Sequence, residues 1–208
     1  MAAVRARFRP DEPSLTPQSV ELLERLLRPT DVGVEWGSGN TTAWFAKRTT
    51  HLTSFESLPP YYEQVAANLR AQGLTNVDYR LFDQDFDDYE GDETAMHESP
   101  YVRGARAFGD ETLDYALIDS IPRGCLCASV IPKLKPGGLL ILDNANWYLP
   151  PPSSVRPAVP SSTTALMGTS GSAVPDNQCW PEMARRTADW RSCWSSNGVQ
   201  MTLILIKP

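Results

Sequence analysis

Residues 32–42 constrain the fold of this chain more than any other stretch of its sequence. A short apolar run contains Glu35, the glycines Gly37 and Gly39 follow one residue apart, and a helical pattern begins at Thr41. Glycine at these two positions permits a sharp turn and lets a ligand lie close to the backbone, while the helix presents N–H groups at its start. The stretch therefore predicts a strand, a tight turn and a helix, with a ligand site at the turn.

Strand-like and helix-like segments alternate along most of the chain, and two strand patterns follow one another at its end. Such alternation predicts a parallel sheet with helices on both faces, and the closing pair predicts one antiparallel partner. We therefore expect an α/β fold with a doubly wound, mostly parallel sheet. The strand patterns lie at 32–36, 51–56, 77–82, 113–119, 139–143, 190–194 and 201–206.

The length of 208 residues predicts a single domain, 1–208, with a sizeable core. Residues 1–15 are basic and then interrupted by proline, so we expect a loose arm there. The connections 84–111 and 150–175 show no clear apolar period and are long for a compact domain. We expect them to form inserted loops, and the second could close over the functional edge as a lid.

Charge and composition exclude several classes of partner. The net charge is −6 and no long run of Lys and Arg occurs, so we expect no nucleic-acid partner. No apolar stretch reaches the roughly 20 residues that span a bilayer, and the first residues lack the core of a secretory signal. We therefore expect no membrane association and a cytoplasmic location. The four cysteines fit reduced thiols, and Cys125 and Cys127 are poorly spaced in a helix to share a zinc ion.

An acidic residue stands at the end of each of the first five strand patterns. The carboxyl ends of parallel strands meet at one edge of a sheet, and ligands of such sheets bind there. Five acids at this edge predict a polar crevice rather than isolated turn residues. They are Glu35, Glu56, Asp83, Asp119 and Asp143.

Two of these acids indicate the kind of ligand. Glu56 follows the second strand pattern, where a carboxylate can accept hydrogen bonds from both hydroxyls of a ribose. Glu35 lies directly before the glycine turn, where it would repel a pyrophosphate and attract a cationic group. Thr42 also stands where a dinucleotide fingerprint has its third glycine. A ligand with an adenosine-like ribose and a cationic end fits this pattern, and S-adenosylmethionine has both.

Four motifs in order resemble those of class I S-adenosylmethionine-dependent methyltransferases. The run 34–42 is similar to the Glu-x-Gly-x-Gly motif of that family. The segments 53–56 and 114–119 are similar to its second and fourth acidic motifs, and 135–143 to its Pro-Gly-Gly strand. The resemblance covers about residues 30–145. It implies a Rossmann-like sheet of seven strands with an antiparallel last strand.

The resemblance also implies roles for individual residues. Glu35 and the glycine turn would hold the methionine part of the cofactor, Glu56 the ribose, and Asp83 with Gln84 the adenine amino group. Asp119 would lie near the transferred methyl group. The expected cofactor-binding residues are Glu35, Gly37, Ser38, Gly39, Thr41, Thr42, Glu56, Ser57, Asp83, Gln84 and Asp119.

Asp119, Asp143 and Asn144 supply oxygen ligands at two neighbouring strand ends, a set that suits Mg²⁺ or Ca²⁺. This set is similar to the metal triad of catechol and caffeoyl-coenzyme A O-methyltransferases, which makes Mg²⁺ a candidate second cofactor. The sequence departs from those enzymes at 120–123. They carry Lys or a further acid just after the first ligand, whereas this chain has Arg123, which is a poor base.

We expect O-methylation of a small-molecule acceptor, with Asp119 and Asp143 as candidate catalytic bases. His97 is a further candidate base, and Tyr101, Trp147 and Tyr148 are candidates to line an aromatic pocket. A homodimer is a candidate assembly. Three other functions stay open: a non-catalytic cofactor-binding module, aminopropyl or aminobutyrate transfer from the same cofactor, and a nicotinamide dehydrogenase, which Glu35 and Thr42 disfavour.

Overall fold

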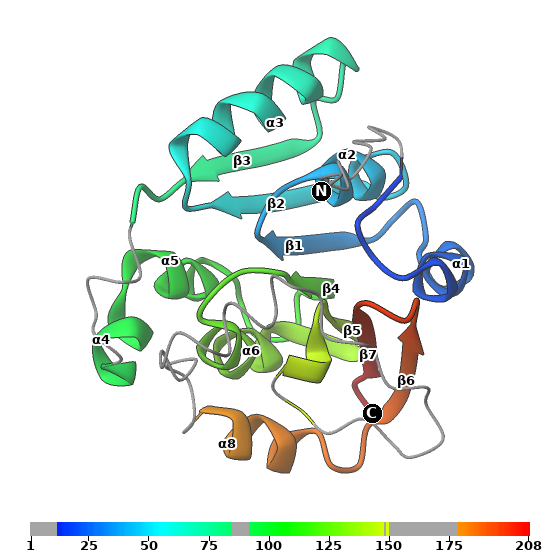
Figure 1. The fold of residues 1–208 in the computed structure, drawn as a ribbon, viewed down its shortest axis with the longest axis vertical. Helices are drawn as coiled ribbons and strands as arrows, with labels where there is room; N and C mark the ends of the chain where they lie inside the picture. Colours follow the sequence, from blue (N-terminus) through cyan, green and yellow to red (C-terminus); the bar gives the residue numbers. More distant parts are fainter. Residues whose placement is uncertain (1–11, 85–91, 148, 150–178) are drawn as a thin grey trace, which may run out of the picture.

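The computed structural model describes the chain except for residues 1–11, 85–91, 148 and 150–178 (Figure 1). Most of the expected arm 1–15, the expected lid 150–175 and Tyr148 therefore lie outside the described residues. None of the helices in the described part of the chain combines the length and the apolarity that crossing a membrane requires.

Seven strands form one sheet in the order β3-β2-β1-β4-β5-β7-β6. The neighbours from β3 to β5 pair in parallel, whereas β7 pairs antiparallel with both β5 and β6. The predicted α/β class and the antiparallel last strand are thus confirmed. The strands are β1 (Val32–Trp36), β2 (His51–Glu56), β3 (Val77–Leu81), β4 (Leu113–Ile118), β5 (Leu134–Leu142), β6 (Arg191–Ser196) and β7 (Met201–Ile206).

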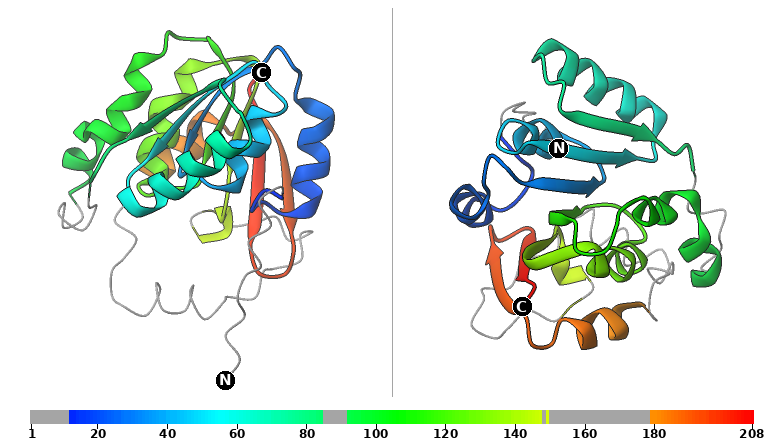
Figure 2. Two further views of the ribbon diagram at one scale, coloured as in Figure 1. Left: turned by 90° about the horizontal axis from the view of Figure 1, so that it is seen from above. Right: turned by 180° about the vertical axis from the view of Figure 1, so that it is seen from behind.

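Helices cover both faces of the sheet, and Figure 2 shows α1 on one side of it and the helices of residues 93–130 on the other. One face packs against α1 (Pro17–Leu26), α2 (Asn40–Ala46) and α3 (Pro59–Ala71). The other face packs against α4 (Glu93–Glu98), α5 (Pro100–Arg103), α6 (Arg123–Val130) and α8 (Cys179–Arg186). The described residues also form the 3₁₀ turns η2 (Gly104–Ala107), η3 (Ile131–Lys133) and η4 (Ala145–Trp147).

Strand β5 shows why this sheet sits between two helical layers. Its apolar run alternates between the faces, so that Leu139 and Ile141 pack toward α1 and α2, and Leu140 and Leu142 pack toward α6. A strand that is apolar on both sides is stable only when both sides are covered. The carboxyl ends of β1, β2, β4 and β5 consequently meet at one rigid edge.

The segment 84–111 differs from the sequence expectation, which found no regular structure in it. Its described part contains α4, α5 and η2. Asp92 begins α4 by accepting the N–H groups of Thr94 and Ala95, and Ser99 begins α5 by accepting the N–H of Val102. These helices have six and four residues, too few for an apolar period to show in the sequence.

Candidate functional site

The glycine turn packs directly against the end of β4. Gly37 has φ +87°, and a Cβ there would lie 2.5 Å from the carbonyl oxygen of Asp119, so glycine alone fits without strain. The Asp119 N–H donates to the Trp36 carbonyl at 2.8 Å, which fixes β4 beside β1. This is the point at which the strand order reverses, with β2 on one side of β1 and β4 on the other.

Glu35 lies beneath the turn, with no exposed surface. Thr41, Thr42 and Ser54 all donate hydroxyl hydrogen bonds to its carboxylate, those from Thr42 and Ser54 at 2.5 and 2.8 Å. The Thr42 hydroxyl also accepts the Gly39 N–H at 2.9 Å. The carboxylate therefore joins β1, β2 and the start of α2. Its predicted contact with the methionine end of a cofactor stays a prediction.

Burial raises the pKa of Glu35 to about 7, because charge is costly away from water, and the three hydroxyl hydrogen bonds oppose this rise. Half-ionised near neutral pH, the group is sensitive to any charge that approaches the turn. Asp119 is one such charge, and it raises the pKa further.

Glu56, at the end of β2, is engaged by four donors. Oε2 accepts the Ser38 N–H at 3.1 Å and the Ser38 hydroxyl at 2.5 Å, and Oε1 accepts the N–H groups of Ser57 and Leu58 at 2.8 and 3.0 Å. The Ser38 hydroxyl also lies 2.6 Å from the Tyr79 hydroxyl on β3. Because a carboxylate has about four acceptor positions, Glu56 has no acceptor position to spare in this state.

Asp83 and Gln84 follow β3 at the same edge of the sheet. Asp83 is exposed and Gln84 is half-buried. Next to them, the Phe82 N–H donates to the Glu56 carbonyl at 2.8 Å, which holds this end of β3 against β2. Their expected contact with an adenine ring stays a prediction.

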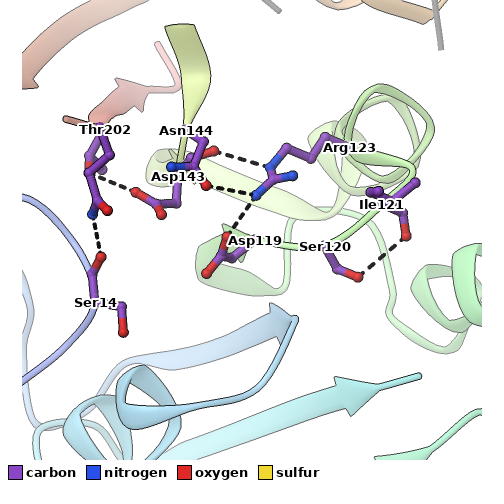
Figure 3. A network of polar contacts seen from close by, with 9 residues as sticks. Ser14, Asp119, Ser120, Ile121, Arg123, Asp143, Asn144 and Thr202 are labelled. Atoms are coloured by element: carbon purple, nitrogen blue, oxygen red, sulfur yellow. Dashed lines mark hydrogen bonds and ion pairs between the residues drawn. The ribbon is translucent and has the colours of Figure 1, made fainter. Parts of the chain in front are cut away.

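Arg123, the first residue of α6, lies among the polar groups that follow β4 and β5 (Figure 3). Its Nη2 donates to Asp119 Oδ1 at 2.7 Å and to Asn144 Oδ1 at 3.3 Å, and its Nε donates to the Asp143 carbonyl at 3.1 Å. Thr202, on β7, donates to Asp143 Oδ1 at 3.1 Å. The sheet edge thus brings together the three residues that the sequence singled out as metal ligands.

Both carboxyls in this cluster have raised pKa values. Burial is the main cause for Asp143, whose side chain is almost inaccessible, and the neighbouring charge of Asp119 adds to it, giving a pKa of about 7. Burial also raises the pKa of Asp119, and the Arg123 guanidinium opposes this rise. A carboxyl that titrates near neutral pH is suited to general base chemistry.

The predicted Mg²⁺ site at Asp119, Asp143 and Asn144 is not supported. The guanidinium of Arg123 bridges Asp119 and Asn144, so a cation already occupies the position between their oxygens. Arginine keeps its proton in proteins, and a second cation beside it would be repelled. The donor set therefore does not fit a metal ion. The order of ligand residues in the sequence does not show that the Arg123 side chain of α6 lies between them.

Two tyrosines at this edge went unnoticed in the sequence. Tyr79 contacts Ser38, and its ring stacks on Tyr62 with centroids 4.4 Å apart. The Tyr61 hydroxyl lies 3.4 Å from where a Cβ of Gly39 would stand, and burial together with the charges of Glu56 and Asp119 raises the pKa of Tyr61. The register of β3 places Tyr79 at this edge, and the start of α3 places Tyr61 there. No local sequence motif predicts either position.

Two further candidates, one aromatic and one basic, lie among the residues that the structure describes. Tyr101 is fully buried beside the glycine turn: its hydroxyl donates to the Phe55 carbonyl at 3.4 Å and also hydrogen-bonds with Ser120 and Gly37, and the Trp36 indole N–H donates to its carbonyl at 3.0 Å. Its expected place in an aromatic pocket stays a prediction. His97, on α4, lies beside Cys125 and Cys179. The role suggested for Trp147 falls on a side chain that the structure does not describe.

A hollow of about 360 Å³ lies on another part of the surface. It borders the segments just before β1 and β2, at the amino ends of these strands, and so it is separate from the acidic edge. Its lining residues are Glu24, Leu27, Pro29, Lys47, Arg48 and Thr49.

We expect Glu35→Gln to remove a pH dependence of the free energy of unfolding. The folded-state pKa of about 7 exceeds the ordinary value of 4.5, so the folded state binds more protons between these pH values. Stability from this group is therefore present at low pH and lost as pH rises through about 7, by at most about 1.4 kcal/mol per pH unit. Denaturant unfolding of both proteins from pH 4 to pH 8 measures the difference, and parallel curves would contradict it.

We expect Arg123→Ala to lower the free energy of unfolding by on the order of 3 kcal/mol, because it leaves the buried Asp143 carboxyl and the half-buried Asp119 carboxyl without their cation. Millimolar Mg²⁺ or Ca²⁺ should then raise the melting temperature of this variant and leave the unmodified protein unchanged. Arg25→Ala is the control, since Arg25 makes an exposed ion pair with Glu21 and should cost less than about 1 kcal/mol. An equal rise in the melting temperature of the unmodified protein on addition of Mg²⁺ or Ca²⁺ would overturn this account of Arg123.

No family model matches the sequence, and no curated protein matches it. Solved structures do match the fold. An rRNA methylase from Streptococcus thermophilus superposes with a TM-score of 0.57 at 12% identity, over 94% of this chain and 99% of that one. A methyltransferase from Geobacter sulfurreducens gives a TM-score of 0.58 at 16% identity, over 96% of this chain and 81% of that one.

A protein from Streptococcus mutans, described as a methyltransferase and solved in complex with S-adenosylhomocysteine, gives a TM-score of 0.58 at 9% identity, over 92% and 96% of the two chains. Identities this low establish similarity of fold alone. The chain thus has the Rossmann-like fold of class I S-adenosylmethionine-dependent methyltransferases, as its motifs predicted.

Proposed function

We propose that the chain transfers a methyl group from S-adenosylmethionine to an oxygen atom of a small-molecule acceptor. The observation that supports this most is the arrangement at the reversal of strand order, where Gly37, Glu56 and Asp119 converge on one turn. The fold that the chain shares with methyltransferases supports the same assignment.

In this proposal the cofactor lies along the glycine turn. Glu56 would accept the hydroxyls of its ribose, Asp83 and Gln84 would bind its adenine, and the turn with Asp119 would hold its methionine end. Glu56 must release a donor to receive the ribose, because all of its acceptor positions are engaged. The Ser38 hydroxyl is the donor that can leave, since Tyr79 lies 2.6 Å away and offers it another partner.

The Asp119 cluster is the proposed acceptor end of the site. When bound, S-adenosylmethionine would supply the methyl group from its sulfonium and would leave as the neutral thioether, and the Asp119 carboxylate would take the proton of the acceptor hydroxyl. Alignment of oxygen, methyl and sulfur supplies most of the rate, and the base supplies the rest. Arg123 holds Asp119 in place, and Thr202 holds Asp143 behind it.

The proposal includes no metal, because Arg123 takes the position of the cation. It commits to a small-molecule acceptor on the basis of charge. A nucleic acid would meet a chain of net charge −6 and an edge that carries five acids, whereas phosphate backbones bind basic surfaces. Some structures of this fold are rRNA methylases, so RNA belongs among the acceptors tested.

We expect calorimetric titration to detect micromolar binding of S-adenosylmethionine and of S-adenosylhomocysteine, and none of NAD. Glu56→Ala should weaken this binding at least about tenfold, because it removes the ribose acceptor. Ser38→Ala should keep or improve it, because it frees an acceptor position on Glu56. Glu56→Gln, which preserves side-chain size, controls for loss of folding. Binding of NAD but of neither sulfur compound would reverse the cofactor assignment.

We expect Asp119→Asn to lower turnover by about 10²-fold and to change cofactor affinity only a few-fold, because it removes the base and keeps the shape. Asp110→Asn is the matched control, since Asp110 pairs with Lys133 on the surface. Transfer of labelled methyl groups to hydroxylated small molecules, amines and rRNA measures the acceptor class. Transfer to rRNA alone would refute the small-molecule acceptor, and cofactor binding without any transfer would indicate a binding module.

A further inference from the structure

A cluster of His97, Cys125 and Cys179 lies among the helices that cover one face of the sheet. The three residues come from α4, α6 and α8, which Figure 1 shows on the same side of the molecule. Their ligand atoms all lie within 4.8 Å of one another. Both cysteines are buried, and His97 is half-buried.

This donor set is one that zinc prefers. Two thiolates and one imidazole, with a water in the fourth position, form a known kind of tetrahedral zinc site. At Zn–S distances of about 2.3 Å, two thiolates on one zinc ion stand about 3.7 Å apart. The sulfur atoms of Cys125 and Cys179 are 3.2 Å apart, so a shift of about half an ångström brings them to this separation. The half-buried histidine leaves a path for water to the open position.

No local motif signals this cluster, because its members are far apart along the chain. Cys125 and Cys179 are 54 positions apart, and neither belongs to a Cys-x-x-Cys motif. Cys127 follows Cys125 closely in the same helix, but residues two apart in a helix point to different sides. The fold, and not the local sequence, selects Cys179 as the neighbour of Cys125.

We propose that His97, Cys125 and Cys179 bind one zinc ion, whose binding displaces the two thiol protons. The ion joins α4 and α8, helices of six and eight residues, to α6. Helix α6 begins at Arg123, two residues before Cys125. The zinc ion therefore supports the end of the helix that supplies the guanidinium to the acidic edge, and it takes no part in the proposed methyl transfer.

The test is zinc content and Co²⁺ binding of the full chain under reducing conditions. We expect about one zinc per chain by elemental mass spectrometry after loading and dialysis. Replacing zinc with Co²⁺ should give the thiolate-to-cobalt absorption of a tetrahedral site. His97→Gln and Cys179→Ser should each lower metal affinity at least about tenfold. Chelation should lower the melting temperature of the unmodified protein and leave that of these two variants unchanged.

Two cysteines of the same chain provide matched controls. Cys127→Ser alters a buried thiol of the same helix, and Cys193→Ser alters an exposed thiol on β6, and both should retain one zinc per chain. Because Cys125 is fully buried, Cys125→Ser is a valid test only if its circular dichroism spectrum matches that of the unmodified protein. His97→Gln tests zinc content without changing a thiol. Absence of bound metal in the loaded protein would overturn the proposal. So would a Cys125–Cys179 disulfide, seen as resistance of both thiols to alkylation in denaturant and chelator before reduction.

Discussion

The buried carboxylate of Glu35 is the interaction on which the rest of the edge depends. It accepts hydroxyl hydrogen bonds from α2 and from β2, so one side chain fixes the turn, the helix that follows it and the neighbouring strand. A buried carboxylate without these donors would cost several kcal/mol, and the three donors are therefore as necessary as the acid itself. The glycines shape the turn, but Glu35 determines where the turn lies relative to the sheet.

At the other half of the edge, where β4 and β5 end, the structure depends on the balance between two carboxyls and one guanidinium. Two carboxyls with raised pKa values lie behind and beside the position where β4 and β5 end, and Arg123 supplies the compensating cation from α6. A divalent ion from solvent would supply the same positive charge, but its binding would depend on the concentration of the ion. A guanidinium built into the chain is always present, and its planar donors fix the directions of Asp119 and Asn144.

Strand positions followed from the sequence because apolar runs and glycine turns are local signals. The positions of the acids at the edge could also be predicted from the sequence, because the carboxyl ends of parallel strands lie at the same edge of a sheet. What the sequence could not supply were contacts made across elements. The Ser54 hydroxyl on Glu35, the Ser38 donors on Glu56 and the Arg123 guanidinium come from neighbouring strands, turns and helices. These contacts therefore depend on how the elements pack together. The short helices of 93–103 were missed because their capping residues, Asp92 and Ser99, act over a single turn.

Because β7 lies between β5 and β6 in the sheet, the two halves of the edge are expected to form at different stages of folding. Ser38 and Glu56 are 18 positions apart and lie in one continuous stretch of β1, α2 and β2. Asp143 instead depends on Thr202, 59 positions away, and β7 must enter between β5 and β6 before that hydrogen bond forms. Short-range contacts close faster than long-range ones. The glycine-turn half is therefore expected to mature as an early folding unit, and the half around Asp143 as a late one.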